Sequence, residues 1–147
     1  MKEASWSDCI DKAASVKITP DKEIAKSLVE TADERIKVVA RDLNEKTANF
    51  IFEDYYSSIL EMLHAIILLD GYKVDNHVCL GYYLRDVLRK EHLFRAFDDC
   101  RFKRNALIYY GKRMDFETAK DAIKKAKNVM NELHAMLQRE MKRDQET

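Results

Sequence analysis

The chain has 147 residues, of which 46% are hydrophobic, so it is long enough to form one domain with its own core. Lysine and arginine together number 26, as do aspartate and glutamate, and this balance argues against non-specific binding of nucleic acid over the whole surface. Only 3 glycines and 1 proline are present, too few for the many turns of a β-sandwich or barrel.

The first half of the chain predicts three helices. Residues 5–16 have helical apolar spacing, and Thr19 and Pro20 suit the cap and first position of a second helix. The third helix, residues 46–69, is apolar over most of its circumference, so we expect it to be central and to end at Asp70-Gly71. The apolar face of the second helix consists of Ala25, Leu28, Ala32, Ile36, Val39 and Leu43.

The second half predicts three more helices and no strand. A fourth helix follows its cap Asp75 and contains Gly81, which a bundle tolerates where another helix approaches closely. A fifth, residues 92–110, ends at Gly111, and a sixth begins after Asp115. The predicted fold is an all-α, antiparallel bundle of four to six helices in one domain, 1–147, with a helical N-terminal extension at 1–19.

Cysteine usage and apolar runs indicate a cytoplasmic protein. Cys9, Cys79 and Cys100 are far apart and form no CxxC pair, so we expect neither a zinc site nor a disulfide framework. The opening residues MKEASWSDCIDK lack the apolar core of a signal peptide, and the longest apolar run, AIILL, is too short to span a bilayer. We therefore expect no membrane association and small, buried, reduced cysteines.

The stretch CRFKRNALIYYGK, residues 100–112, holds the main functional candidates. Arg104 interrupts an otherwise apolar stripe of the fifth helix, and an arginine is rarely buried without a partner or a function. Asn105 shares a helix face with Tyr109. The alternative is structural: the arginine packs its stem inward at a subunit interface, and the tyrosines end an amphipathic helix. The surrounding basic residues are Arg101, Lys103, Lys112 and Arg113.

FKRNALIYYGKRMDFETAKDAIKKAK resembles the last two core helices of the HEPN family, the small helical domains of prokaryotic ribonuclease toxins and nucleotidyltransferase partners. YYSSILEMLHAIILLDGYK and NHVCLGYYLRDVL resemble its earlier helices, so the resemblance covers residues 48–137, a HEPN-like core. The family signature is an arginine, often followed by asparagine, and then a histidine. Arg104 and Asn105 match it, but 109–111 hold tyrosine, tyrosine and glycine where the histidine would fall.

The resemblance implies a homodimer that binds RNA or nucleotide phosphate through an Arg104-Asn105 groove, and we expect no cofactor and no metal. Tyrosine titrates too far above neutral pH to be an efficient base, so Tyr109 makes a degenerate motif, and RNase activity should be weak or lost. The protein would act in a toxin–antitoxin pair with a nucleotidyltransferase. Residues assigned to binding are Arg101, Lys103, Tyr110 and Lys112.

Two histidine-bearing segments offer further candidates. Glu61 and His64 belong to a polar strip on the third helix; this strip is either a solvated face or the wall of a groove in which Glu61 pairs with Arg104 as a supporting residue. His77 follows a helix cap, where a local turn contact is more typical than chemistry. Two rival functions stay open: a non-catalytic homodimeric interaction module, and an active metal-independent endoribonuclease that uses Tyr109 or His64.

Overall fold

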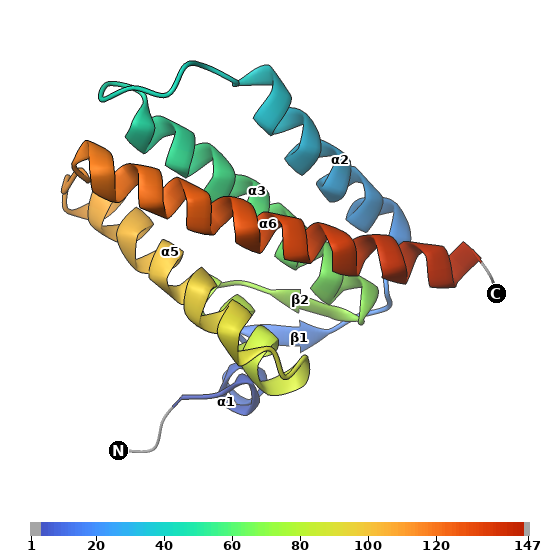
Figure 1. The fold of residues 1–147 in the computed structure, drawn as a ribbon. Coiled ribbons are helices and arrows are strands. Elements are labelled where there is room, and N and C mark those ends of the chain that lie inside the picture. The colour runs from blue at the N-terminus through green and yellow to red at the C-terminus, as the bar shows by residue number, and fades with distance from the viewer. Residues whose placement is uncertain (1–3, 146–147) are drawn as a thin grey trace.

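Six α-helices, one π-helical segment and a two-stranded sheet form the part of the chain that this computed structural model describes, residues 4–145 (Figure 1). The all-α bundle is therefore confirmed. The helices are α1 (Trp6–Asp11), α2 (Lys22–Val38), α3 (Ala48–Leu69), α4 (His77–Tyr82), the π-helix η1 (Tyr83–Val87), α5 (Glu91–Tyr109) and α6 (Phe116–Gln145); the strands are β1 (Ser15–Lys17) and β2 (Tyr72–Val74). None of the described helices has the length and apolar character needed to cross a membrane.

The central helix is α3, as its apolar sequence predicted. It packs against α2 and α6, and α5 contacts both α3 and α6 (Figure 1). Phe52, Ile59 and Leu63 are each completely buried in it, because neighbouring helices cover several of its faces. Burial of large apolar side chains contributes about 1.5–3 kcal/mol each, so this helix holds most of the bundle together.

The N-terminal segment differs from the predicted helix at 5–16. The helix α1 ends at Asp11, Ala13 has a φ of 57°, and the chain then forms β1, which pairs antiparallel with β2 in the register Ser15 with Val74. The prediction of no strand was therefore wrong. The apolar spacing near Trp6 is local, whereas the strand depends on hydrogen bonds to residues far along the chain, which local periodicity does not reveal.

Helix caps also shift by one or two residues. Asp21, not Thr19, caps α2, accepting a hydrogen bond from the Ile24 N–H at 3.0 Å. Asn76, not Asp75, caps α4, accepting from the Cys79 N–H at 2.9 Å. Thr19 and Asp21 are both good capping residues, as are Asp75 and Asn76. Which of the two caps the helix therefore depends on where the preceding chain turns.

Gly81 lies where α5 crosses α4, as its place inside a helix predicted. A Cβ atom at this position would come within 3.3 Å of the Phe94 ring and 3.4 Å of the Phe97 ring. Glycine therefore permits close contact between the two helices, which sets the position of α5 relative to α4.

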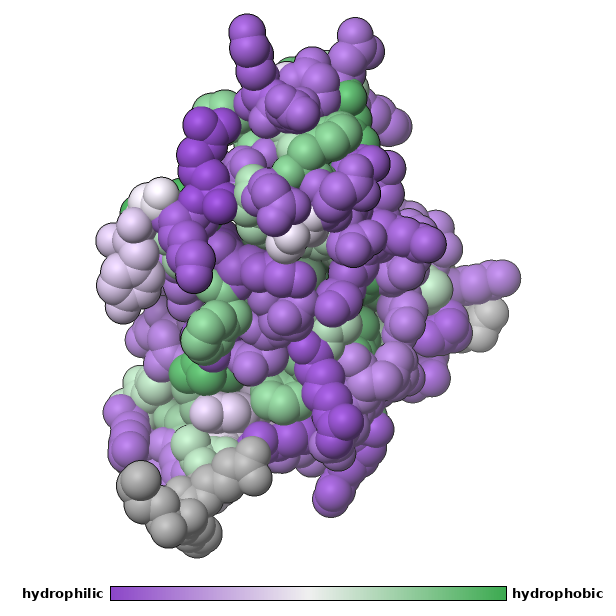
Figure 2. All heavy atoms as spheres, turned by 60° about the vertical axis from the view of Figure 1, so that its left-hand side comes forward, coloured by the Kyte–Doolittle hydropathy of each residue, from purple (hydrophilic) through white to green (hydrophobic). Residues whose placement is uncertain are grey.

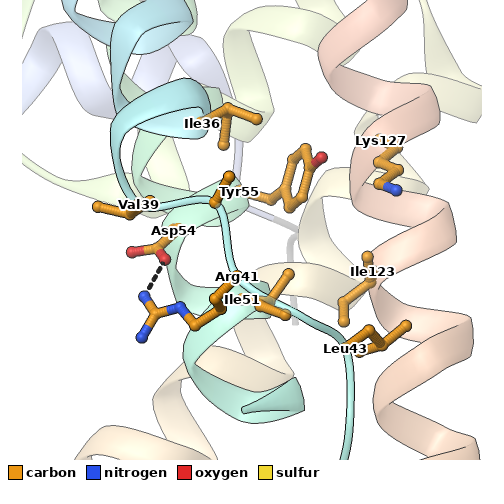
Figure 3. Close-up of a pocket in the computed structure, with 10 residues that line it drawn as sticks. Ile36, Val39, Arg41, Leu43, Ile51, Asp54, Tyr55, Ile123 and Lys127 are labelled. Carbon is orange, nitrogen blue, oxygen red and sulfur yellow. Dashed lines mark hydrogen bonds and ion pairs between the residues drawn. The ribbon is translucent and has the colours of Figure 1, made fainter.

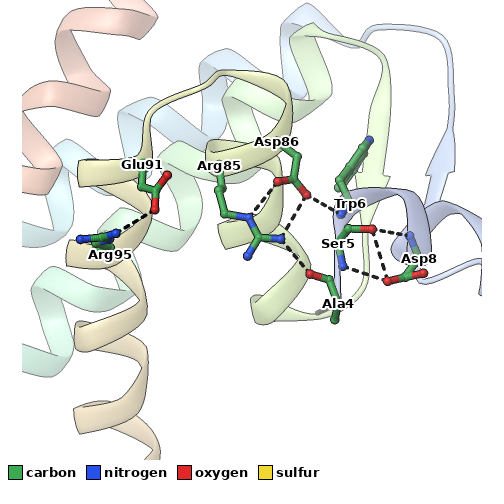
Figure 4. A network of polar contacts seen from close by, with 8 residues as sticks. All are labelled: Ala4, Ser5, Trp6, Asp8, Arg85, Asp86, Glu91 and Arg95. Atoms are coloured by element: carbon green, nitrogen blue, oxygen red, sulfur yellow. Dashed lines mark hydrogen bonds and ion pairs between the residues drawn. The ribbon is translucent and has the colours of Figure 1, made fainter. Parts of the chain in front are cut away.

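The N-terminal segment is fastened to α4 and η1 by a disulfide and a polar network. Cys9 and Cys79 are bonded, which corrects the expectation of reduced, unpaired cysteines, while Cys100 is free and buried. The two cysteines are 70 residues apart, so their spacing in the sequence does not reveal the bond. The disulfide also removes one argument for a reducing compartment. Figure 4 shows Asp86 accepting from the Trp6 N–H at 2.8 Å and Arg85 donating to the Ala4 carbonyl at 2.8 Å.

We predict that reduction destabilises the fold. Because the disulfide closes a loop of 70 residues, its loss should lower the free energy of unfolding by about 2–4 kcal/mol. Thermal melts with and without dithiothreitol measure this, and a Cys9→Ala/Cys79→Ala variant should be insensitive to the reductant. Equal melting temperatures for oxidised and reduced wild type would contradict it.

Candidate functional site

The carboxyl end of α5 and the link to α6 form a basic segment in a fixed conformation. Residues 100–114 contain five basic side chains and no acidic one. Gly111 closes the helix with a φ of 62°, as predicted, and the Lys112 N–H donates to the Ala106 carbonyl at 3.0 Å. The buried Asn49 side chain of α3 holds both the N–H and the carbonyl of Met114, at 3.0 and 3.1 Å. The link is therefore anchored to the core.

Arg104 lies on the inward stripe of α5 and is held by aromatic rings. Leu93, Phe97 and Cys100 of this stripe are buried, whereas Arg104 and the next stripe residue, Leu107, are partly buried. The guanidinium carbon is 5.6 Å from the centre of the Tyr56 ring and 5.9 Å from that of Tyr109. Both distances suit cation–π attraction.

No carboxylate among the described residues pairs with Arg104. Aromatic faces attract a cation but leave its N–H donors without acceptors. The guanidinium therefore keeps the capacity to form a forked contact with an oxyanion such as phosphate.

A groove of about 410 Å³ lies beside the same Tyr109 ring. We call it the α5 groove. It brings together five of the residues singled out in the sequence, and in the described part of the chain neither Asn105 nor Lys112 has a side-chain partner. Arg101 pairs with Asp98 at 2.9 Å. The groove is lined by Arg101, Phe102, Asn105, Ala106, Tyr109, Tyr110 and Lys112.

The rim of the groove exposes aromatic side chains. Phe102 is 71%, Tyr109 68% and Tyr110 82% exposed, which is unusual for large rings. Figure 2 turns the side of the molecule that carries this end of α5 forward, and apolar residues form separate patches there among polar ones. Exposed rings interleaved with cations give this surface two ways to hold a ligand: stacking and charge.

Lys103, Glu61 and Arg104 are absent from the lining of the groove, and Arg104 adjoins it only through the Tyr109 ring. Lys103 pairs with Asp99 at 2.8 Å, and Asp99 also accepts from Lys125 of α6 at 3.0 Å, so Lys103 joins α5 to α6. The predicted pairing of Glu61 with Arg104 is wrong: Glu61 accepts from Arg35 of α2, at 3.0 Å from Nε and 2.7 Å from Nη2. At 100° per residue, Glu61 is on a different face of α3 from Tyr56, which contacts Arg104.

The structure adds Tyr56 and His77 to the site. The Tyr56 hydroxyl is 3.2 Å from His77 Nδ1, and its ring stacks on Phe97. Burial, and next the charge of Arg104, lower the pKa of His77, so its imidazole is neutral at neutral pH. Burial raises the pKa of Tyr56, despite the nearby charge of Arg104. No sequence pattern indicates this pairing, because it joins α3 to α4 through tertiary packing.

The arrangement offers anion binding more readily than metal chemistry. No group of three or more histidine, cysteine, aspartate or glutamate side chains among the described residues is placed to hold a metal ion. Comparison with protein-family models, with curated proteins and with solved structures gives no match. The HEPN resemblance therefore stays a prediction, and the candidate function rests on the site itself.

We predict that acid destabilises the protein partly through His64. Burial lowers the pKa of His64 below its ordinary value of 6.5, so the unfolded chain binds more protons just below that pH. The free energy of unfolding should therefore fall as the pH drops below 6.5.

Urea unfolding at about pH 7.5 and about pH 5.5 measures this fall, and His64→Gln should reduce it. His92→Gln is the matched control, because His92 is exposed and pairs with Glu132 at the surface. The same loss of stability in wild type and His64→Gln would contradict the assignment.

Proposed function

We propose that this protein is a HEPN-like helical protein that binds RNA or a nucleotide phosphate at the α5 groove and the adjoining Arg104, with weak or lost RNase activity. The observation that carries the proposal is the Arg104 guanidinium, which lies between two tyrosine rings and has no carboxylate partner among the described residues. A phosphate oxygen satisfies its donors in the forked geometry that arginine favours.

Single-stranded RNA fits the groove better than a duplex. Phe102, Tyr109 and Tyr110 expose rings on which unpaired bases can stack, and stacking contributes about 1–3 kcal/mol per base. Lys112 and Arg101 would lie near the backbone phosphates. Because the whole chain has zero net charge, electrostatic attraction to RNA acts only at this basic segment. A short strand is therefore favoured over a long one.

Weak cleavage follows from the groups near Arg104. Tyr109 occupies the place of a histidine, and tyrosine is a poor base at neutral pH. His77 is neutral but already in contact with the Tyr56 hydroxyl. A non-cleaving RNA-binding protein is consistent with a toxin–antitoxin pair in which a nucleotidyltransferase acts.

We predict that Arg104→Ala weakens binding of a short single-stranded RNA at least about tenfold, since a charge-assisted contact contributes about 1.5–3 kcal/mol. Loss of one phosphate contact should also reduce the slope of log K against log salt by about 0.7. Fluorescence anisotropy over a salt series measures both. Cleavage followed in EDTA should stay low for wild type.

Arg95→Ala is the matched control, because Arg95 is on the same helix but is exposed and pairs with Glu91. It should bind RNA about as well as wild type. Equal weakening by the two substitutions would indicate general charge attraction and contradict a specific site. Rapid metal-free cutting that Arg104→Ala abolishes would show that the site is an active nuclease.

A homodimeric interaction module is the second candidate. The same part of α5 exposes Phe102, Ile108 and Tyr109, and a two-fold pairing of this face with itself would cover them. In that case Arg104 acts only as an interface residue.

We predict that Phe102→Glu shifts a wild-type dimer to monomer, because two carboxylates would be brought into an apolar contact. Sedimentation velocity at high micromolar concentration measures the change. Glu91→Gln, which alters a charge at the far end of α5, is the control. A wild-type monomer would contradict the dimer, and a dimer unaffected by Phe102→Glu would place its interface elsewhere.

A further inference from the structure

A second cavity lies on the other side of the bundle, away from the α5 groove. The end of α2, the loop at 39–47, α3 and α6 enclose about 180 Å³ (Figure 3). We propose that this cavity binds a small amphipathic carboxylate, with an aromatic ring or a chain of about six carbons inside and the carboxylate at Lys127. This proposal is independent of the function of the α5 groove.

The walls of the cavity are apolar. Ile123 of α6 is buried, and Ile36 and Ile51 face it from α2 and α3 (Figure 3). An apolar cavity of about 150 Å³ in a protein core holds a benzene molecule, so this volume is sufficient for a ring or a short alkyl chain.

The polar groups at the rim favour a single negative charge. Arg41 and Asp54 form an ion pair at 2.7 Å, so their charges cancel. Lys127 has no carboxylate partner in the described part of the chain, and its ammonium lies 5.5 Å from the centre of the Tyr55 ring. The Tyr55 hydroxyl likewise has no hydrogen-bond partner among those residues. An ammonium and a phenol are both donors to a carboxylate.

The loop at 39–47 provides a route of entry. Arg41 and Leu43 of this loop line the cavity, and the Arg41–Asp54 pair is partly exposed, with side-chain exposures of 38% and 23%. Partly exposed ion pairs contribute little to stability, so breaking the Arg41–Asp54 pair to admit a ligand costs little. Closing the pair again would cover the apolar part of the ligand.

Calorimetric titration with hexanoate, benzoate and hexanol tests the ligand class. Hexanoate and benzoate should bind one site with a Kd of about 0.1–1 mM, the range for a ligand of about eight heavy atoms. Hexanol should bind about fivefold more weakly, because it lacks the charge. In NMR spectra of labelled isoleucine methyl groups, the shift changes should be confined to Ile36, Ile51 and Ile123.

Three variants identify the groups responsible. Lys127→Met should weaken hexanoate binding about fivefold and leave hexanol binding unchanged. Lys124→Met, which removes an exposed charge from the same helix, is the matched control and should change neither. Ile36→Trp should fill the cavity and abolish binding of both ligands, with circular dichroism verifying its fold.

The proposal is overturned if hexanoate titration shows no saturation, or if the shift changes lie at α5. Equal effects of Lys127→Met and Lys124→Met also overturn it, since they would indicate attraction to surface charge alone. Should Ile36→Trp not fold, the comparison of the two lysine variants still decides the outcome.

Discussion

The burial of Tyr56 in the middle of α3 is the constraint on which the candidate site depends. A helix buried on several faces can accept a phenol only if its hydroxyl finds a partner, and His77 Nδ1 lies 3.2 Å away. This contact fixes the start of α4 against α3. The Tyr56 ring in turn stacks on Phe97 and faces the Arg104 guanidinium, so one side chain sets the positions of α4 and α5.

The same packing explains why Arg104 lacks a carboxylate. The stripe that it interrupts is apolar, and α3 presents the Tyr56 ring to it, whereas Glu61 is turned toward Arg35 on α2. A guanidinium can remain in such a place because its stem packs on the core and the rings offset part of its desolvation. The rings cannot accept hydrogen bonds from its N–H groups, so these donors remain available to an oxyanion.

Sequence patterns predicted the features that depend on local chemistry. The apolar circumference of α3, Gly81 at a helix crossing and Gly111 at a helix end all follow from side-chain size or backbone freedom at one position. The pairs that join distant segments did not follow: Cys9 with Cys79, Glu61 with Arg35, and β1 with β2. Several residues could have served as partner in each case, and only the packed fold selects among them.

The site residues divide in the same way. Arg101, Asn105 and Tyr109 come together because they are near one another along one helix, and helical geometry is readable from sequence. His77 contacts Tyr56 from another helix, whereas its sequence position favoured only a local turn contact.

The α5 groove and the cavity at Lys127 share one electrostatic feature: a cation near each of them has no carboxylate partner among the described residues. With equal numbers of acidic and basic residues, most cations that pack against the core can find a carboxylate, as Arg35, Arg41 and Lys103 do. Arg104 and Lys127 instead lie against tyrosine rings, each beside a concave surface. A cation held this way is positioned without being neutralised, which is why we propose an anionic ligand at both sites. The shapes separate them: the α5 groove is open and rimmed by exposed rings, whereas the cavity at Lys127 is small and has apolar walls.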